Sequence, residues 1–269
     1  MSSPASPEPL AAERPSIARI YDYFLGGFNN FAVDRAAAER LRALAPDTPE
    51  IMRANRAFLR RAVEFLLDRG VDQFLDLGSG LPTAGNVHEV AQERDPAARV
   101  VYVDNDPVVV AHSAALLRDN PRATAIQADV RQPEAILAHP TVRRLLDLDR
   151  PLAVLLVAVL HFVADDRAAA RAVAALRSRL APGGYLVIAH GTDEGLPPDL
   201  LAEGQQVYTR AASPFRARPR AQVARFFRGL DLVEPGVVYA PRWRPDGPDE
   251  RFFDQPARSR NLAGVGRKP

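Results

Sequence analysis

The chain has 269 residues, 47% of them hydrophobic and 25% charged, which is enough apolar sequence for one large domain with a buried core. It contains no cysteine, which excludes disulfides, zinc–thiolate centres and cysteine nucleophiles, and we expect no metal site. The net charge is only +2, with arginines dispersed among acids, and no apolar run reaches the roughly 20 residues of a membrane span, so we expect neither nucleic acid nor a membrane as a partner.

The first segment, residues 1–13, has neither a basic start nor an apolar stretch. It does not resemble a secretory signal, and we expect a disordered tail on a cytoplasmic protein. The predicted helices that follow cover residues 16–25, 34–44 and 49–69. A glycine or a proline stands at or near the end of each, and apolar residues recur every third and fourth position in the longest.

From residue 73 onward, short apolar runs alternate with helical patterns. The predicted strands cover residues 73–77, 99–104, 123–127, 152–158 and 184–190, and the predicted helices between them cover residues 83–93, 107–118, 133–146 and 166–180. The third of these helices contains Pro140, where it is expected to break. Strands without clean period-two alternation, separated by helices, predict an α/β fold whose parallel sheet is covered on both faces.

The C-terminal part departs from this alternation. Residues 197–228 are predicted to form one or two helices, and residues 230–240 and 261–266 two further strands. A polar, proline-rich loop lies between these strands.

The turn after the first predicted strand is the most informative motif of the chain. Asp76 lies in the strand, which breaks into Gly78-Ser79-Gly80 before a helix. Such a turn lets backbone N–H groups approach a nucleotide-like cofactor closely. The dinucleotide fingerprint requires a third glycine where Thr83 stands, whereas an acid two residues before the first glycine favours S-adenosylmethionine. Alternatively, Asp76 caps the turn locally.

Two more acids follow predicted strands. Asp104, with Asn105 beside it, ends the second strand, where a carboxylate accepts hydrogen bonds from ribose hydroxyls. Asp129 follows the third strand, where it is placed to face an adenine amino group while the N–H of Val130 meets a ring nitrogen. The alternative for Asp129 is a local turn cap. Asp106, followed by proline, is assigned to structure as a helix N-cap.

Several stretches together resemble an actinobacterial family of S-adenosylmethionine-dependent methyltransferases whose substrates are largely unassigned. The N-terminal run Ile-Ala-Arg-Ile-Tyr-Asp-Tyr-Phe-Leu-Gly-Gly begins the match. The matching stretches are residues 17–31, 53–63, 74–88, 101–107 and 155–163. The resemblance is close over residues 14–192 and looser after them.

The resemblance implies a class I, Rossmann-like methyltransferase fold with a seven-stranded, mostly parallel sheet whose last strand is antiparallel. It divides the chain into a helical cap, residues 14–70, and an S-adenosylmethionine-binding domain, residues 71–269. As parts of a lid, Tyr21 or Phe31 would contact adenosine or substrate, and Asn29 the methionine head group. Otherwise, Gly26-Gly27 and Asn29-Asn30 simply form turns. Asn55 and Arg56 either meet the methionine carboxylate, or Asn55 faces solvent.

Histidines are the candidates for a general base. His161 follows the fourth predicted strand, at the sheet edge where ligands bind, and is placed to take a proton from a hydroxyl or amine. His190, after the fifth strand, is a second candidate. The alternative is that His161 packs beneath the cofactor or caps the next helix.

Two features near the C-terminus stay open between function and structure. Arginines 210, 216, 218 and 220 either steer an anionic acceptor or form a solvated helix end. Trp243 either walls the acceptor pocket or packs its loop.

Taken together, these motifs predict an S-adenosyl-L-methionine-dependent methyltransferase that acts on an oxygen or nitrogen atom of a small molecule. An Asn/Asp-Pro-Pro-Tyr/Phe signature is absent after the fourth strand, which counts against nucleic-acid and protein amide substrates. The alternatives are a nicotinamide-dependent Rossmann oxidoreductase and a non-catalytic S-adenosylmethionine-binding protein. The motifs do not indicate an oligomeric state.

Overall fold

The computed structural model describes residues 14–82, 85–196, 198–210 and 214–269. The predicted disordered tail, residues 1–13, lies outside this range. No helix in the described part is long and apolar enough to cross a membrane.

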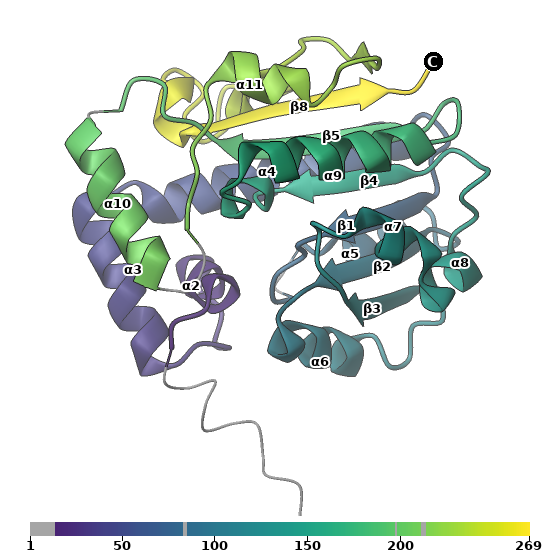
Figure 1. The fold of residues 1–269 in the computed structure, drawn as a ribbon, viewed down its shortest axis with the longest axis horizontal. Helices are drawn as coiled ribbons and strands as arrows, with labels where there is room; N and C mark the ends of the chain where they lie inside the picture. Colours follow the sequence, from purple (N-terminus) through teal and green to yellow (C-terminus); the bar gives the residue numbers. More distant parts are fainter. Residues whose placement is uncertain (1–13, 83–84, 197, 211–213) are drawn as a thin grey trace, which may run out of the picture.

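Eight strands of the described chain form one sheet in the order β3-β2-β1-β4-β5-β8-β6, and β7 also pairs with β8 (Figure 1). Strands β1 to β5 are parallel, and β8 runs antiparallel to β5. The strands are β1 (Gln73–Leu77), β2 (Arg99–Asp104), β3 (Ala123–Gln127), β4 (Ala153–Val157), β5 (Tyr185–Gly191), β6 (Asp231–Leu232), β7 (Val238–Tyr239) and β8 (Asn261–Arg267). The expected parallel sheet with an antiparallel last strand is confirmed.

The predicted strand over residues 230–240 is divided in two. β6 and β7 lie along the same edge of β8 and occupy one position of the sheet, which accounts for eight strands in seven positions. Pro235 and Gly236 separate them: proline has no N–H to donate, and Gly236 has a φ of +83°. The N–H of Gly236 donates to the carbonyl of Val233 at 2.8 Å and closes a turn.

The helices match their predicted places with one clear exception. They are α2 (Ile17–Phe24), α3 (Ala32–Leu44), α4 (Thr48–Leu67), α5 (Val87–Arg94), α6 (Pro107–Leu116), α7 (Pro133–Ala138), α8 (Pro140–Leu145), α9 (Asp166–Arg179), α10 (Pro198–Arg210) and α11 (Arg220–Arg225). α5 begins at residue 87 rather than 83 because Glu89 accepts hydrogen bonds from the N–H groups of Gly85 and Asn86, each at 2.9 Å.

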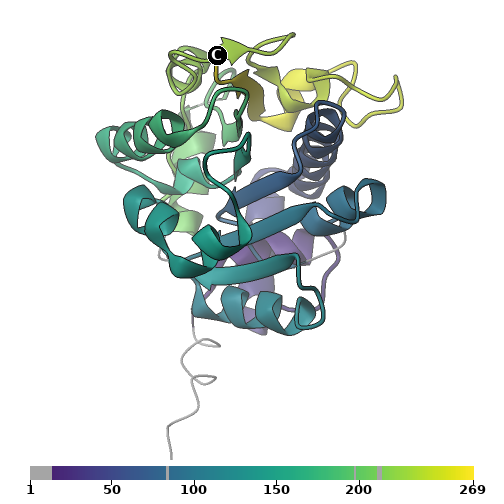
Figure 2. The same cartoon turned by 90° about the vertical axis from the view of Figure 1, so that its right-hand side faces the viewer.

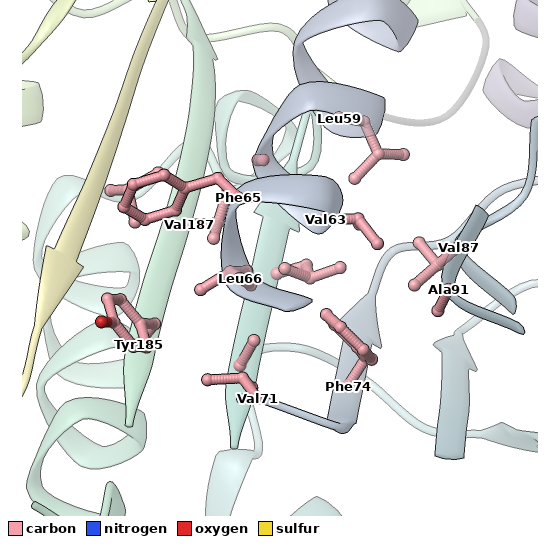
Figure 3. Close-up of a cluster of buried hydrophobic side chains, with 14 of the residues drawn as sticks. Leu59, Val63, Phe65, Leu66, Val71, Phe74, Val87, Ala91, Tyr185 and Val187 are labelled. Carbon is pink, nitrogen blue, oxygen red and sulfur yellow. The ribbon is translucent and has the colours of Figure 1, made fainter. Parts of the chain in front are cut away.

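One face of the sheet is covered by α4 and α5. Leu59, Val63 and Leu66 of α4 belong to a buried cluster with Phe74 of β1 and Val187 of β5 (Figure 3). The alternation of side chains along β1 puts Leu75 and Leu77 on the other face, in a cluster with α7, α8, α9 and α11. Figure 2 shows α4 and α9 on opposite sides of the sheet. Coverage of both faces explains why the strand sequences lack alternation.

A third, smaller cluster lies beside the carboxyl ends of the parallel strands. Ile20 and Phe24 of α2 pack with Ala38 and Leu41 of α3, and Tyr208 of α10 packs against them. Figure 1 shows α2, α3 and α10 next to one another on that side of the sheet. The division of the chain at residue 70 stays a prediction. α4, which precedes this residue, packs in the core of the sheet, and α10, which follows it, packs with α2 and α3.

Candidate functional site

A cavity of about 1070 Å³ lies between the carboxyl ends of the parallel strands and the helices α2, α4 and α10. Of the twelve residues predicted for the site, eleven line it: Tyr21, Asn55, Asp76, Gly78, Ser79, Gly80, Asp104, Asn105, Asp129, Val130 and His161. The described lining does not include Asn29. The parallel topology brings four segments of the sequence together at the carboxyl ends of β1 to β4, and α2 and α4 add Tyr21 and Asn55 as two more.

The glycine turn is held tightly against neighbouring strands. Gly78 and Gly80 have φ values of +71° and +66°, which favour glycine. A Cβ on Gly78 would lie 2.2 Å from a methyl carbon of Val159, so only glycine fits there without displacement. The N–H of Gly78 donates to the carbonyl of Val103 at 2.7 Å, and the N–H of Gly80 to Asp104 Oδ2 at 2.9 Å. These bonds fix the turn at the cavity wall.

Asp104 also accepts from the N–H of Asp106 at 3.0 Å, and burial raises the pKa of its carboxyl. Asp106 caps α6, since its Oδ1 accepts from the N–H of Val108 at 2.9 Å. The structural assignment of Asp106 is therefore confirmed.

Asp129 lines the cavity and also caps its own turn. Its carboxylate accepts from the backbone N–H of Arg131 at 2.8 Å and from the guanidinium Nε at 2.9 Å. These hydrogen bonds from Arg131 lower the pKa of Asp129. Asp129 therefore caps its own turn, as the structural alternative predicts. Because it also lines the cavity, its contact with adenine stays a prediction.

Asp76 is a buried carboxylate that accepts no hydrogen bond from the described residues. Burial raises its pKa to about 7, against the lowering effect of the Arg56 charge and with a smaller contribution from the charge of Asp104. The described residues give no sign of the local turn cap considered for Asp76. A buried acid without a donor is unfavourable unless a ligand supplies one, so this position suits a cationic or hydrogen-bond-donating group.

Tyr21 of α2 and Asn55 of α4 line the same cavity. The Nδ2 group of Asn55 donates to the Tyr21 hydroxyl at 2.9 Å, and this hydroxyl donates to the carbonyl of Met52 at 3.2 Å. Asn55 is buried, and its Oδ1 has no hydrogen-bond partner among the described residues. The alternative that Asn55 faces solvent is wrong.

Asn29 and Phe31 lie away from the cavity, contrary to the lid hypothesis for them. Asn29 is exposed, and its backbone N–H donates to Asp22 Oδ2 at 2.9 Å. Asn30 donates to the same oxygen from its side chain at 3.0 Å. Phe31 is exposed, with the guanidinium of Arg19 5.1 Å from its ring centre. Asp22 organises these residues as a turn, so the structural alternative holds for Asn29 and Asn30.

His161 lies in the short helix η1 (Leu160–Phe162) just beyond β4. Its Nδ1 accepts from the N–H of Gly191 at 3.1 Å; since an amide can only donate, the neutral ring carries its proton on Nε2. Burial holds the pKa of His161 well below its ordinary value, with His190 and Arg218 acting in the same direction. A ring in this state donates from Nε2 and has no free lone pair, so we replace the predicted general base by a hydrogen-bond donor.

His190 does not line the cavity in the described structure. It is fully buried, with Nδ1 2.7 Å from the carbonyl of Gly191 and Nε2 2.9 Å from the Arg218 guanidinium. Because the carbonyl requires a donor and Arg218 supplies one, both ring nitrogens are engaged. The second prediction of a general base is therefore wrong.

The arginine cluster and Trp243 have structural roles. Arg218 is buried and donates to the carbonyls of Leu160 and Val163, while Arg216 and Arg220 pair with Asp166 and Glu194. The side chain of Arg210 lies outside the described part. Trp243 is fully buried, 5.3 Å from the ring of Phe58 and 5.4 Å from that of Phe65, so it packs its loop.

Sequence reasoning missed the residues that line the far end of the cavity. These are Tyr208, Phe215, Arg260 and Asn261. One signal was available for the last two: an antiparallel strand begins at the edge where parallel strands end, so residues at the start of β8 had to lie beside the site. Tyr208 and Phe215 follow no strand, and no motif marked them.

Comparison with known proteins assigns the chain to one group. The S-adenosyl methyltransferase family matches residues 3–269. A crystal structure of a methyltransferase candidate from Thermobifida fusca YX is 44% identical, with 98% of this chain and 99% of that chain covered and a TM-score of 0.90. A DUF574 family protein from Streptomyces avermitilis MA-4680 is 39% identical, with 97% and 100% covered and a TM-score of 0.89.

A more distant likeness extends to an O-methyltransferase family 2 protein from Planctomyces limnophilus DSM 3776, solved with apigenin. It is 18% identical, with 88% of this chain and 66% of that chain covered and a TM-score of 0.51. At this identity, the likeness shows the fold alone. The search of curated proteins gave no match.

Proposed function

This chain belongs to the S-adenosyl methyltransferase family, and from that premise we propose that it methylates an oxygen or nitrogen atom of a small molecule. The fold is that of a class I methyltransferase, and the cofactor is S-adenosylmethionine. The family match supports neither alternative, the nicotinamide-dependent oxidoreductase or the non-catalytic binding protein.

The cavity residues fit this cofactor in charge and hydrogen bonding. Asp76 is a buried acid to which no described residue donates a hydrogen bond. Asn55 Oδ1 is a buried acceptor without a partner among the described residues. We assign both to the methionine portion, whose ammonium group is a cationic donor. Asp104 is assigned to the ribose hydroxyls and Asp129 with Val130 to the adenine, because all three line the cavity after β2 and β3, and Asp104 binds the glycine turn.

Bound S-adenosylmethionine supplies a methyl group on a sulfonium sulfur, which is already activated toward a nucleophile. The task left to the protein is to hold the acceptor in line and to exclude water. His161 contributes an Nε2–H donor to the cavity, suited to orienting an acceptor oxygen or nitrogen. The bond from Gly191 holds the ring in this tautomer.

The volume of the cavity is the observation that carries the proposal. At about 1070 Å³, it lies at the upper end of the range of about 300–1,000 Å³ that is typical of small-molecule pockets. It has room for the cofactor and a second molecule of modest size. Helices α2, α4 and α10 border it opposite the strand ends, so an acceptor has to fit between these helices and the sheet.

The test is methyl transfer from S-adenosylmethionine labelled in the methyl group, with an actinobacterial cell extract as the source of acceptors. The extract is divided by dialysis into small molecules and macromolecules, and we expect label only in the small-molecule fraction. Asp104→Ala is the inactive comparison, and Asp119→Ala, an exposed acid after α6, is the matched control. Label in the macromolecular fraction alone would contradict the proposal.

A further inference from the structure

The far end of the cavity is an aromatic surface. Tyr208 and Phe215 stack with ring centres 5.1 Å apart and planes 23° apart. Phe162 lies 5.6 Å from Tyr208 and 6.0 Å from Phe215, and the ring of His161 is 4.9 Å from Phe215. All four side chains line the cavity. Such a group of rings offers stacking and edge-to-face contacts to a planar ligand.

Arg260 is a half-buried cation at this same end. It lines the cavity, and its guanidinium makes no hydrogen bond or ion pair with the described residues. The nearest acid acting on it, Asp47, is held by Arg258 through bonds of 2.8 and 3.0 Å. The backbone of Arg260 has a φ of +51°, an unfavourable region for a residue other than glycine. A cation that no described residue pairs, on strained backbone at a cavity wall, indicates a ligand contact.

Gly191 connects the aromatic surface to this cation. A Cβ on Gly191 would lie 2.6 Å from the ring of Phe215. The N–H of Gly191 donates to Nδ1 of His161. On its other side, Gly191 pairs with Asn261 in the sheet, and the next N–H, of Thr192, donates to the carbonyl of Arg260 at 2.9 Å. Gly191 and Thr192 therefore join the aromatic rings and His161 to the backbone of Arg260, and the Arg260 residue lines the same cavity.

The charge of this region differs from that of the cofactor side. The lining residues that precede β5 carry charges of both signs: the acids Asp76, Asp104, Asp106, Asp129 and Asp165, and the arginines Arg14, Arg19, Arg56 and Arg131. From Gly191 of β5 to Asn261 of β8, the described lining residues include one charged side chain, that of Arg260 just before β8, and no acid. A positive group and a neutral N–H donor therefore face whatever occupies this end.

We propose that the methyl acceptor is an acidic aromatic compound, whose ring packs on Phe162, Tyr208 and Phe215 and whose anionic oxygen group is bound by Arg260. This inference rests on the proposed function, since it names the class of small molecule that the same cavity accepts. A carboxylate and a phosphate share the chemistry that a guanidinium binds, through paired N–H donors.

The test uses matched probes that differ in charge. Binding of 4-hydroxybenzoate, its neutral isostere 4-hydroxybenzamide, and 4-hydroxyphenyl phosphate is measured by calorimetry on the protein saturated with S-adenosylhomocysteine. We expect at least one of the two anions to bind at least tenfold more tightly than the amide, and the tighter anion identifies the oxygen group. Arg260→Gln abolishes this preference, and Arg260→Lys, which keeps the charge, retains part of it.

Arg225→Gln, an exposed arginine of α11 outside the cavity lining, is the matched control and keeps the full preference. Unchanged affinity for S-adenosylhomocysteine shows that each variant is folded. Equal binding of anion and amide, absence of binding by all three probes, or a preference that survives in Arg260→Gln would each overturn the inference. Methyl transfer to neutral small molecules alone would refute the acidic acceptor and leave the proposed function standing.

Discussion

Asp76 combines burial with the absence of a donor, and this has a measurable consequence for stability. Its pKa rises from an ordinary value of 3.8 to about 7 because burial disfavours the charged form. In the ligand-free protein, the folded state therefore holds a proton that the unfolded chain releases between these values. Rising pH therefore favours unfolding between these two pKa values. Above pH 7, the folded state no longer gains stability from the proton on Asp76.

We expect Asp76→Asn to be increasingly more stable than the unaltered protein as pH rises from about 4 to 8, by on the order of 4 kcal/mol at the upper end. The measurement is the free energy of unfolding by urea at several pH values, without ligand. Only the difference between the two proteins is compared, since other acids titrate equally in both. A difference that stays constant with pH would show that Asp76 is ionised normally.

His161 shows how one backbone bond decides a chemical role. With the amide of Gly191 bound to Nδ1, the ring offers a donor at Nε2. We expect His161→Gln, which keeps an N–H donor, to retain most activity. His161→Ala loses up to about tenfold in kcat/KM, the equivalent of about 0.5–1.5 kcal/mol for one hydrogen bond.

The pH profile of kcat/KM distinguishes this role from general-base catalysis. Because the pKa of His161 lies well below its ordinary value, its ionisation is not expected to limit the rate near neutral pH. The measurement uses the acceptor found by label transfer. An acid limb near pH 6.5 that disappears in His161→Gln would restore the general-base hypothesis.

At the scale of elements, η1 depends on a distant arginine for its position. Arg218 is fully buried and donates to the carbonyls of Leu160 and Val163 at 2.9 and 2.7 Å, as well as to Asp166 and His190. The segment before α11 thus holds the loop that carries His161. Without Arg218, two buried carbonyls lose their donors.

We expect Arg218→Met to lower the free energy of unfolding by about 3–5 kcal/mol, the usual cost of breaking a buried charged network. Arg216→Met is the matched control, because Arg216 pairs with the same Asp166 at 3.3 Å but is half exposed. Its cost should be about 1 kcal/mol or less. Urea unfolding followed by circular dichroism measures both. Equal losses in the two variants would refute the structural role of Arg218.

At the scale of the whole molecule, the cavity joins parts with separate cores. Its lining comes from the sheet edge, which belongs to two large clusters, and from α2, α3 and α10, which share a small one. A ligand that contacts both sides stabilises the folded state by its binding energy alone.

We therefore expect S-adenosylhomocysteine at about a hundredfold its Kd to contribute about 2.7 kcal/mol, which raises Tm by roughly 5–10 °C. NADH at the same concentration should leave Tm unchanged. Differential scanning calorimetry is the measurement, and Asp104→Ala should show a smaller shift than Asp119→Ala. A shift with NADH alone would contradict the cofactor assignment.

The sequence by itself determined the elements and the cofactor side of the site. Strands such as β1 were predictable because a short apolar run bounded by glycine has few other local solutions, and α6 because Asp106 and Pro107 begin a helix. Asp76, Asp104 and Asp129 were predictable as cavity residues because parallel strands bring their carboxyl ends to one edge.

Only the tertiary structure decided the acceptor side and the state of its groups. The tautomer of His161 depends on an amide thirty residues away, and the exposure of Asn29 depends on how Asp22 gathers the turn around itself. Arg260 reaches the cavity through strand pairing between β5 and β8, and Tyr208 through the packing of α10 on α3. Contacts between segments so far apart in the sequence depend on how whole elements pack. The local preferences of the sequence for helix, strand or turn do not predict them.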